Sequence, residues 1–231
     1  MGRMNKLAYM IGRSAEYYQD RTAFICDGET MTFRQAHRQS GALAGALHSL
    51  GVQKQERVAV LLPNCIQYAV IDFSLIKGGY VRVPLNPRLA VQEMEYILKD
   101  SETGVLFYSS EYTDKVNRLK ENVSLKHWVC VGDGRETDDL RYDRLINDAG
   151  DSGFVRPTED DDLFQIAYTS GTTGRPKGVV TTVRSRISSL NNVLIDELHI
   201  HAEDVMLHAA SLSHGGGTKV LPHFVKGAAN V

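Results

Sequence analysis

A continuous apolar run and a second expected strand, separated by a helical segment, most constrain what this chain can fold into. The apolar run, Val58 to Leu62, stops at Pro63, and the second strand, Tyr80 to Val83, stops at Pro84. A run without polar alternation is typical of a strand that is buried on both faces. Because a helix is expected over Cys65 to Lys77 between them, we predict a strand–helix–strand unit with parallel strands.

The same alternation continues on both sides of this unit. Thr32 and Gln35 have the capping-box spacing that begins a helix, and Gly51 closes that helix. Further helices are expected over residues 91–99 and 111–122, and strands over residues 105–108 and 127–131. Repeats of this length predict an α/β fold with mostly parallel sheets that are flanked by helices.

We predict that the chain divides into two doubly wound α/β lobes. Residues 133–162 are acidic and broken by glycines, apart from one short helix near residues 140–146, and we interpret them as a linker. Residues 1–160 would form the first lobe, and residues 161–231 would begin a second. In the second lobe we expect strands at 163–168, 179–182 and 205–209 and helices at 184–197 and 218–226. So few strands leave the second lobe incomplete, which predicts that the chain is a fragment of a longer protein.

Composition argues against several classes of function. The net charge of −2 gives no electrostatic basis for general binding to nucleic acid or to a membrane surface. No apolar run approaches the roughly 20 residues of a membrane span, and the first residues lack the apolar core of a signal peptide. Cys26, Cys65 and Cys130 are far apart and odd in number, which favours a reducing, cytoplasmic compartment over a disulfide scaffold.

The stretch from Tyr168 to Gly178, YTSGTTGRPKG, has the composition of a ligand-binding loop. It contains three glycines, four Ser and Thr hydroxyls, one proline and two cations. Glycine lets backbone N–H groups approach an anion, hydroxyls add donors, and lysine adds a mobile positive charge. Together these features predict a polyphosphate-binding loop, since a solvent-exposed turn does not need them.

The common phosphate-binding motifs do not match this loop. The Walker A pattern requires a glycine where Pro176 stands, and the pattern G-x-G-x-x-G is absent. The loop is also expected to join two strands, whereas both of those motifs join a strand to a helix.

The loop resembles the phosphate-binding signature of the acyl-adenylate-forming enzymes, which include acyl-CoA synthetases, luciferases and peptide-synthetase adenylation domains. Weaker matches precede it in the same order. Asp20 to Phe24 with Thr30 to Phe33 resembles the opening hairpin of that family, and Leu62 to Asn64 with residues 78–88 resembles the core of its first lobe. The resemblance spans most of the chain.

The resemblance implies an ATP-dependent carboxylate–CoA ligase, which converts a carboxylic acid to an acyl-adenylate and then transfers the acyl group to coenzyme A. Donors and a cation offset the repulsion between the two anions that must meet. The ATP phosphates would be bound by Thr169, Ser170, Gly171, Thr172, Thr173, Gly174 and Lys177. The family's segments for adenine, ribose, Mg²⁺ and the catalytic lysine are absent before Val231. We therefore expect no catalytic residue in this chain, Mg²⁺ ligands outside it, and no ligase activity from the chain alone.

A second segment, SLSHGGG at residues 211–217, resembles a family segment of the form P-L-x-H-x-x-G, whose histidine lies near the acyl pocket. Its first residue departs from that form, because Ser211 stands where proline is usual. The resemblance implies that the substrate is bound by His214, Gly215 and Gly216. We predict no metal site, since the spacing of His199, His201, His208 and His214 fits no standard zinc site.

Two alternatives to the CoA ligase stay open. A peptide-synthetase adenylation domain would use the same loop but would load a carrier protein. A non-catalytic phosphate-binding module would keep the loop without the reaction. The partners implied for the ligase are a small carboxylic acid, ATP, coenzyme A and the missing remainder of its own domains. Small residues beside His214 favour a fatty or aryl acid over acetate.

Overall fold

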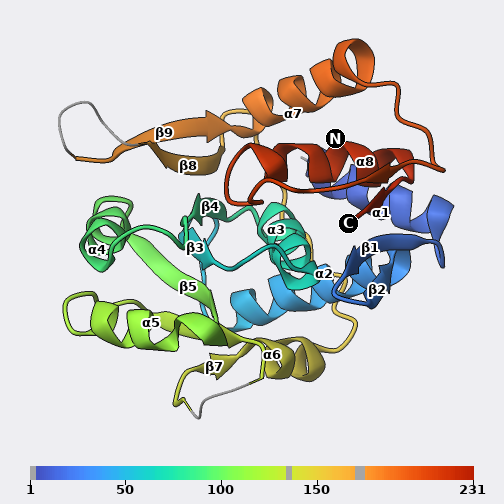
Figure 1. Ribbon diagram of the computed structural model, residues 1–231. Helices are drawn as coiled ribbons and strands as arrows, with labels where there is room; N and C mark the ends of the chain where they lie inside the picture. The colour runs from blue at the N-terminus through green and yellow to red at the C-terminus, as the bar shows by residue number, and fades with distance from the viewer. Residues whose placement is uncertain (1–3, 134–136, 170–174) are drawn as a thin grey trace.

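The computed structural model describes residues 4–133, 137–169 and 175–231 of the chain. These residues form one sheet of seven strands and one of four, with helices between and around them (Figure 1). The prediction of an α/β fold with mostly parallel sheets is confirmed. None of the helices formed by these residues is long and apolar enough to cross a bilayer.

The larger sheet has the strand order β7-β6-β5-β3-β4-β8-β9, and every neighbouring pair is parallel except β8 and β9. Its strands are β3 (Arg57–Leu61), β4 (Val81–Pro84), β5 (Thr103–Ser109), β6 (His127–Val131), β7 (Leu140–Arg141), β8 (Leu163–Thr169) and β9 (Lys177–Thr182). The strand predicted from the continuous apolar run is confirmed, since β3 is buried from Val58 to Leu61.

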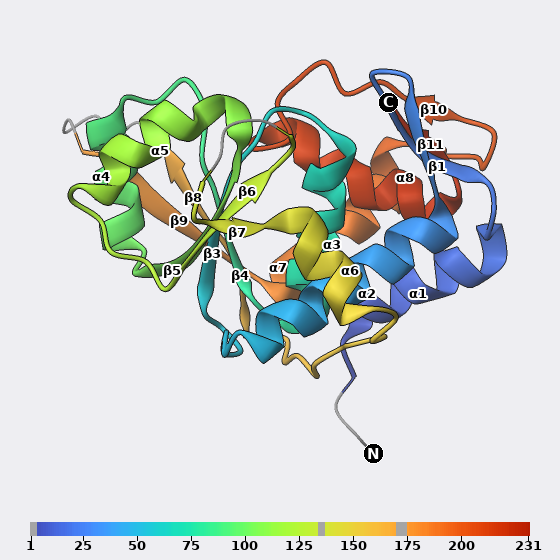
Figure 2. The same ribbon diagram turned by 90° about the horizontal axis from the view of Figure 1, so that it is seen from below.

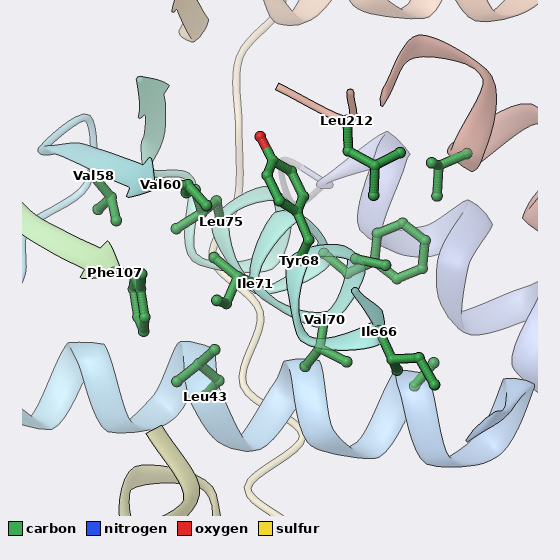
Figure 3. Packing of buried hydrophobic residues seen from close by; sticks show 14 of the residues in the cluster. Leu43, Val58, Val60, Ile66, Tyr68, Val70, Ile71, Leu75, Phe107 and Leu212 are labelled. Carbon is green, nitrogen blue, oxygen red and sulfur yellow. The ribbon is translucent and has the colours of Figure 1, made fainter. Parts of the chain in front are cut away.

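Helices cover both faces of this sheet. The α-helices of the described residues are α1 (Lys6–Tyr18), α2 (Phe33–Ser49), α3 (Ile66–Gly78), α4 (Val91–Asp100), α5 (Thr113–Lys120), α6 (Tyr142–Ala149), α7 (Val183–Asn192) and α8 (Val220–Lys226). Successive residues of a strand point to opposite faces, so Val58 and Val60 pack with α2 and α3, whereas Ala59 and Leu61 pack with α4 and α5. Figure 3 shows the first face, where Leu43 of α2 lies on one side of α3.

The predicted start of α2 is confirmed atom by atom. The Thr32 hydroxyl accepts the Gln35 backbone N–H at 3.2 Å, and Gln35 Oε1 accepts the Thr32 backbone N–H at 2.8 Å. After the helix, Gly51 has a φ of +83°, a conformation that favours glycine. The helix is therefore fixed at both ends by residues that the sequence pattern identified.

The smaller sheet joins the two ends of the chain. Its order is β10-β11-β1-β2, and β11 pairs in parallel with both β10 and β1. The strands are β1 (Thr22–Cys26), β2 (Glu29–Thr32), β10 (Val205–Met206) and β11 (Ala229–Asn230). Behind the sheet, the Phe224 ring of α8 lies 4.5 Å from the Phe33 ring and 4.8 Å from the Phe73 ring, centroid to centroid. This aromatic cluster packs α8 against α2 and α3.

Residues 137–162, which belong to the segment interpreted as a linker, pack against the first lobe. Their short strand β7 joins the edge of the large sheet, and α6 lies along α2 (Figure 2). Beyond α6, Ser152 Oγ donates to the Gly41 carbonyl at 2.9 Å, and the Arg156 N–H donates to the Lys77 carbonyl at 2.8 Å. Hydrogen bonds to α2 and α3 therefore hold this acidic segment against the first lobe.

The strand pairing also crosses the boundary predicted between residues 160 and 161. On the far side of that boundary, β8 and β9 extend the sheet of β3 to β7, whereas β10 and β11 join the sheet that begins with β1. Each sheet therefore contains strands from both sides of the boundary. The sequence does not reveal this, because an apolar pattern predicts a strand but not which strand pairs with it. As a division between domains, the boundary stays a prediction.

Candidate functional site at the carboxyl edge of the large sheet

The order of the parallel strands creates a crevice at one edge of the large sheet. The chain passes from β3 to β4 on one side, and then to β5 on the other side of β3. The loops that follow β3 and β5 therefore leave in opposite directions, and open α/β sheets bind ligands outside the carboxyl ends of strands at such a switch point. Asn64 follows β3, Arg88 follows β4 and Tyr112 follows β5.

A hollow of about 770 Å³ lies at this edge. Its walls come from the three strand ends and from the segment that precedes α8. The residues that line it are Pro63, Asn64, Asn86, Pro87, Arg88, Tyr112, Ala209, Ala210, Ser211 and His214. The structure thus brings the predicted substrate residue His214 to the edge where the topology favours a ligand.

The β8–β9 hairpin directs the predicted phosphate loop to the same edge. Because β8 runs parallel to β4, its carboxyl end with Thr169 lies on the side of the sheet where Asn86 and Arg88 follow β4. Across the hairpin Thr169 pairs with Lys177, and both residues are exposed. The other predicted phosphate ligands, Ser170, Gly171, Thr172, Thr173 and Gly174, lie outside the described residues. The two described ends of the loop therefore present one hydroxyl and one ammonium group side by side.

Tyr168 anchors this end of the hairpin to α4. Its phenol donates to Asp100 Oδ2 at 2.6 Å. Burial, together with the neighbouring carboxylate, raises the pKa of Tyr168 above its ordinary value, so the phenol stays protonated and remains a donor. The hydrogen bond holds the strand just before the loop against the last residue of α4.

Asn64 fixes the other wall of the hollow. Its side-chain Nδ2 donates to the carbonyls of His208 and Ala210, each at 3.0 Å, and its Oδ1 accepts the Leu212 N–H at 2.8 Å. One amide therefore makes three hydrogen bonds to a segment that follows it by about 150 residues. Without Asn64 these backbone groups would need water or another partner.

His214 follows directly on this fixed segment. Its Nδ1 lies 2.9 Å from Ser213 Oγ, which lies 2.8 Å from Ser211 Oγ. The His214 side chain is exposed, whereas Ser213 is buried. Ser211 and Ser213 therefore form a hydrogen-bonded chain that orients the imidazole.

The two glycines predicted to bind substrate have different surroundings. A Cβ atom on Gly216 would lie 2.7 Å from the Ala210 carbonyl oxygen and 2.9 Å from that of Ser211. A Cβ atom on Gly215 would have no heavy atom within 4 Å. Gly216 is thus required by the close packing of the turn, while Gly215 borders open space. Direct contact with substrate stays a prediction for both.

Sequence reasoning missed Asn64, Arg88 and Tyr112 as wall residues of the hollow. Leu62 to Asn64 and residues 78–88 entered only as matches to a fold core. Their position immediately after predicted parallel strands was the available signal, since those strand ends meet at one edge. What the sequence could not show was the three-bond contact between Asn64 and residues 208–212.

Comparison with known proteins bears on this arrangement of strand ends, hairpin and histidine segment. A sequence model of the AMP-binding enzyme family matches residues 11–231. The chain belongs to this family. The predicted resemblance to acyl-CoA synthetases is confirmed by curated relatives and by solved structures.

Among curated members of the AMP-binding family, a long-chain-fatty-acid–CoA ligase of Salmonella typhimurium is 28% identical over 83% of this chain. A long-chain-fatty-acid–CoA ligase of Mycobacterium tuberculosis is 37% identical over 67% of it. The anthranilate CoA ligase AuaEII, solved with anthranoyl-AMP, superimposes with a TM-score of 0.89 at 26% identity, over 96% of this chain and 44% of its own. The chain spans 39% of the length of the Salmonella enzyme and 30% of the mycobacterial one.

Proposed function

We propose that this chain is part of an ATP-dependent carboxylate–CoA ligase that works through an acyl-adenylate. The observation that carries the proposal is the convergence of two predicted sites on one sheet edge. Thr169 and Lys177 present donors at the base of the phosphate loop, and His214 lines the hollow. A carboxylate that attacks the α-phosphate of ATP needs both groups of contacts at one place.

The chemistry of the available side chains fits a nucleoside triphosphate. An exposed lysine beside a threonine hydroxyl at the end of a hairpin can bind phosphate oxygens without burying charge in the absence of the ligand. ATP supplies the leaving group, pyrophosphate. Ligands for Mg²⁺ and the catalytic lysine are expected outside this chain, so we expect the chain alone to be inactive. Coenzyme A is the favoured acceptor over a carrier protein, because the relatives named above are CoA ligases.

Binding of tripolyphosphate tests the phosphate site. We expect calorimetric titration to show binding by the wild-type chain, and at least about tenfold weaker binding by Lys177→Met, which removes a charge-assisted hydrogen bond. Lys126→Met is the matched control. Lys126 pairs with Glu56 at 2.8 Å and immediately precedes β6, at the opposite edge of the sheet. Equal affinities of the wild type and Lys177→Met would contradict the assignment of the loop.

Exchange of pyrophosphate into ATP tests the reaction itself. We expect the 231-residue chain to give no carboxylate-dependent exchange above background, with long-chain and aryl acids alike. Exchange by the chain alone would refute the prediction that a fragment is inactive, while it would support the ligase chemistry.

A further inference from the structure

A second cavity, of about 290 Å³, lies between α3, β4, β8, α7 and the start of α8, and it shares no lining residue with the hollow that contains His214. Figure 1 shows that α7 continues from the end of β9, at the opposite end of the hairpin from its loop. Ser185 and Ser189 on α7 line the cavity and are exposed, so it opens to solvent along that helix. None of the residues assigned above to phosphate or substrate binding lines this cavity.

Two buried arginines line this cavity. Arg82 on β4 and Arg186 on α7 are each only 7% exposed. Both guanidinium groups lie over the same ring, at 6.0 Å and 5.8 Å from the centroid of Phe164. Two like charges are therefore held around one aromatic side chain, where the low polarity increases their repulsion.

One carboxylate does not neutralise this pair. Asp72 on α3 is the only acidic residue among the described residues that line the cavity. Arg82 Nη1 donates to Asp72 Oδ2, and Arg82 Nε donates to Gln165 Oε1 at 2.8 Å, so Arg82 is occupied. The cluster keeps one positive charge in excess, because two guanidinium groups share a single carboxylate.

Arg186 is the group left to bind a ligand. Its Nη2 donates to the Thr218 carbonyl at 3.2 Å, which uses only part of its five-donor fork. Burial, together with the charge of Arg82, lowers the pKa of Arg186 to about 10, so the guanidinium remains protonated at neutral pH. A buried cation in this position is unfavourable unless an anion compensates it.

The other walls indicate the kind of anion. The lining includes the hydroxyl-bearing residues Thr181, Ser185 and Ser189 and the apolar residues Phe73, Phe164 and Val220. A cavity of about 150 Å³ is enough to hold benzene, so this one has room for a ring with a carboxylate. Asp72 Oδ1 is buried without a hydrogen-bond partner among the described residues, and a water molecule that enters with the ligand can donate to it.

We propose that this cavity is a binding site for a small organic carboxylate with an apolar body, whose carboxylate accepts bidentate hydrogen bonds from Arg186. The planar guanidinium matches a carboxylate, whereas the exposed loop at Lys177 suits a polyphosphate. The site is distinct from the proposed phosphate site and does not depend on it.

Calorimetric titration of the purified chain with benzoate, at constant ionic strength, tests this assignment. We expect saturable binding by the wild type and at least about tenfold weaker binding by Arg186→Met, which keeps much of the side-chain volume. Asp72→Asn should bind benzoate several-fold more tightly, because it removes the only negative charge from the cluster. A folding defect could weaken benzoate binding by Arg186→Met, but it could not produce the tighter binding expected of Asp72→Asn.

Lys177→Met and inorganic phosphate separate the two sites. We expect Lys177→Met to bind benzoate as the wild type does, and phosphate to be insensitive to Arg186→Met. The proposal is overturned if benzoate binds the wild type and Arg186→Met equally, if Asp72→Asn has no effect, or if Lys177→Met abolishes benzoate binding. In the first two cases the arginine cluster would be a structural ion network, and the phosphate site would be unaffected.

Discussion

Replacing Asn64 tests the contact that fixes the wall of the candidate site. Asn64→Ala removes three hydrogen bonds, to the His208 carbonyl, the Ala210 carbonyl and the Leu212 N–H. A net hydrogen bond in a protein contributes about 1 kcal/mol. Because the bond to Ala210 lies at the exposed surface, we expect the free energy of unfolding to fall by about 2 kcal/mol rather than 3.

Asn86→Ala is the matched control for this change. Asn86 also follows a central strand, but among the described residues its side chain accepts only one hydrogen bond, from the Arg88 N–H at 3.0 Å. We expect a loss of about 0.5 kcal/mol for it. Urea unfolding followed by circular dichroism measures both losses, and an unchanged slope with denaturant shows that the two states are comparable. Equal losses for the two variants would refute the three-bond account.

Hydrogen exchange and a second variant locate the effect of Asn64. In Asn64→Ala the Leu212 N–H loses its acceptor, so we expect its exchange to become faster. Asn64→Asp keeps that acceptor but turns a carboxylate oxygen toward the two carbonyls at neutral pH. This variant should therefore lose at least as much stability as Asn64→Ala while the Leu212 N–H stays protected. Unchanged exchange of Leu212 in Asn64→Ala would mean that this contact does not hold the segment.

The remaining predictions concern two other features. Gly216→Ala should destabilise the chain by about 1–3 kcal/mol, because its new methyl group would contact the Ala210 carbonyl. Gly215→Ala should change stability by less than about 0.5 kcal/mol, because its methyl group would meet open space. Urea unfolding measures both changes, and equal effects would contradict the packing argument. Lys77 is 1% exposed and lies beside His37, and burial lowers its pKa to about 7, below its ordinary value of 10.5. Between pH 7 and 10.5 Lys77 therefore takes up a proton when the chain unfolds, so its contribution to the free energy of unfolding rises with pH. From pH 7 to 9 the free energy of unfolding of the wild type should increase relative to that of Lys77→Met. A difference that stays constant over this range would contradict the lowered pKa.

Local features of this fold could be predicted because local physics determines them. The apolar run at β3, the capping box at Thr32 and the strand–loop–strand at the glycine-rich loop all depend on neighbouring residues. The helix α1 was missed, although Asn5 caps it by accepting the Ala8 N–H at 3.0 Å. Asn5 is the start signal available in the sequence, because asparagine is a common N-cap immediately before a helix.

Long-range pairing was beyond the reach of the sequence pattern. Nothing in the composition of β11 says that it pairs with β1, some 200 residues earlier. The wall formed by Asn64 depends on that pairing, because β10 and β11 hold the segment that leads to His208. The candidate site could therefore be predicted as two separate motifs, while the residues that bring them together could not.

The direction of β8 decides whether those two motifs can act together. β8 contains seven residues, so its two ends lie about 20 Å apart. An antiparallel pairing with β4 would place the phosphate loop at the amino edge of the sheet, opposite the edge where His214 lies. The register Arg82 to Gln165 fixes the parallel direction, and the hydrogen bond from Arg82 Nε to Gln165 Oε1 adds a side-chain contact to it. Arg82, which also lines the cavity beside α7, thus helps to hold the β8–β9 hairpin in place. The loop end of that hairpin presents Thr169 and Lys177, so Arg82 contributes to the position of the proposed phosphate site.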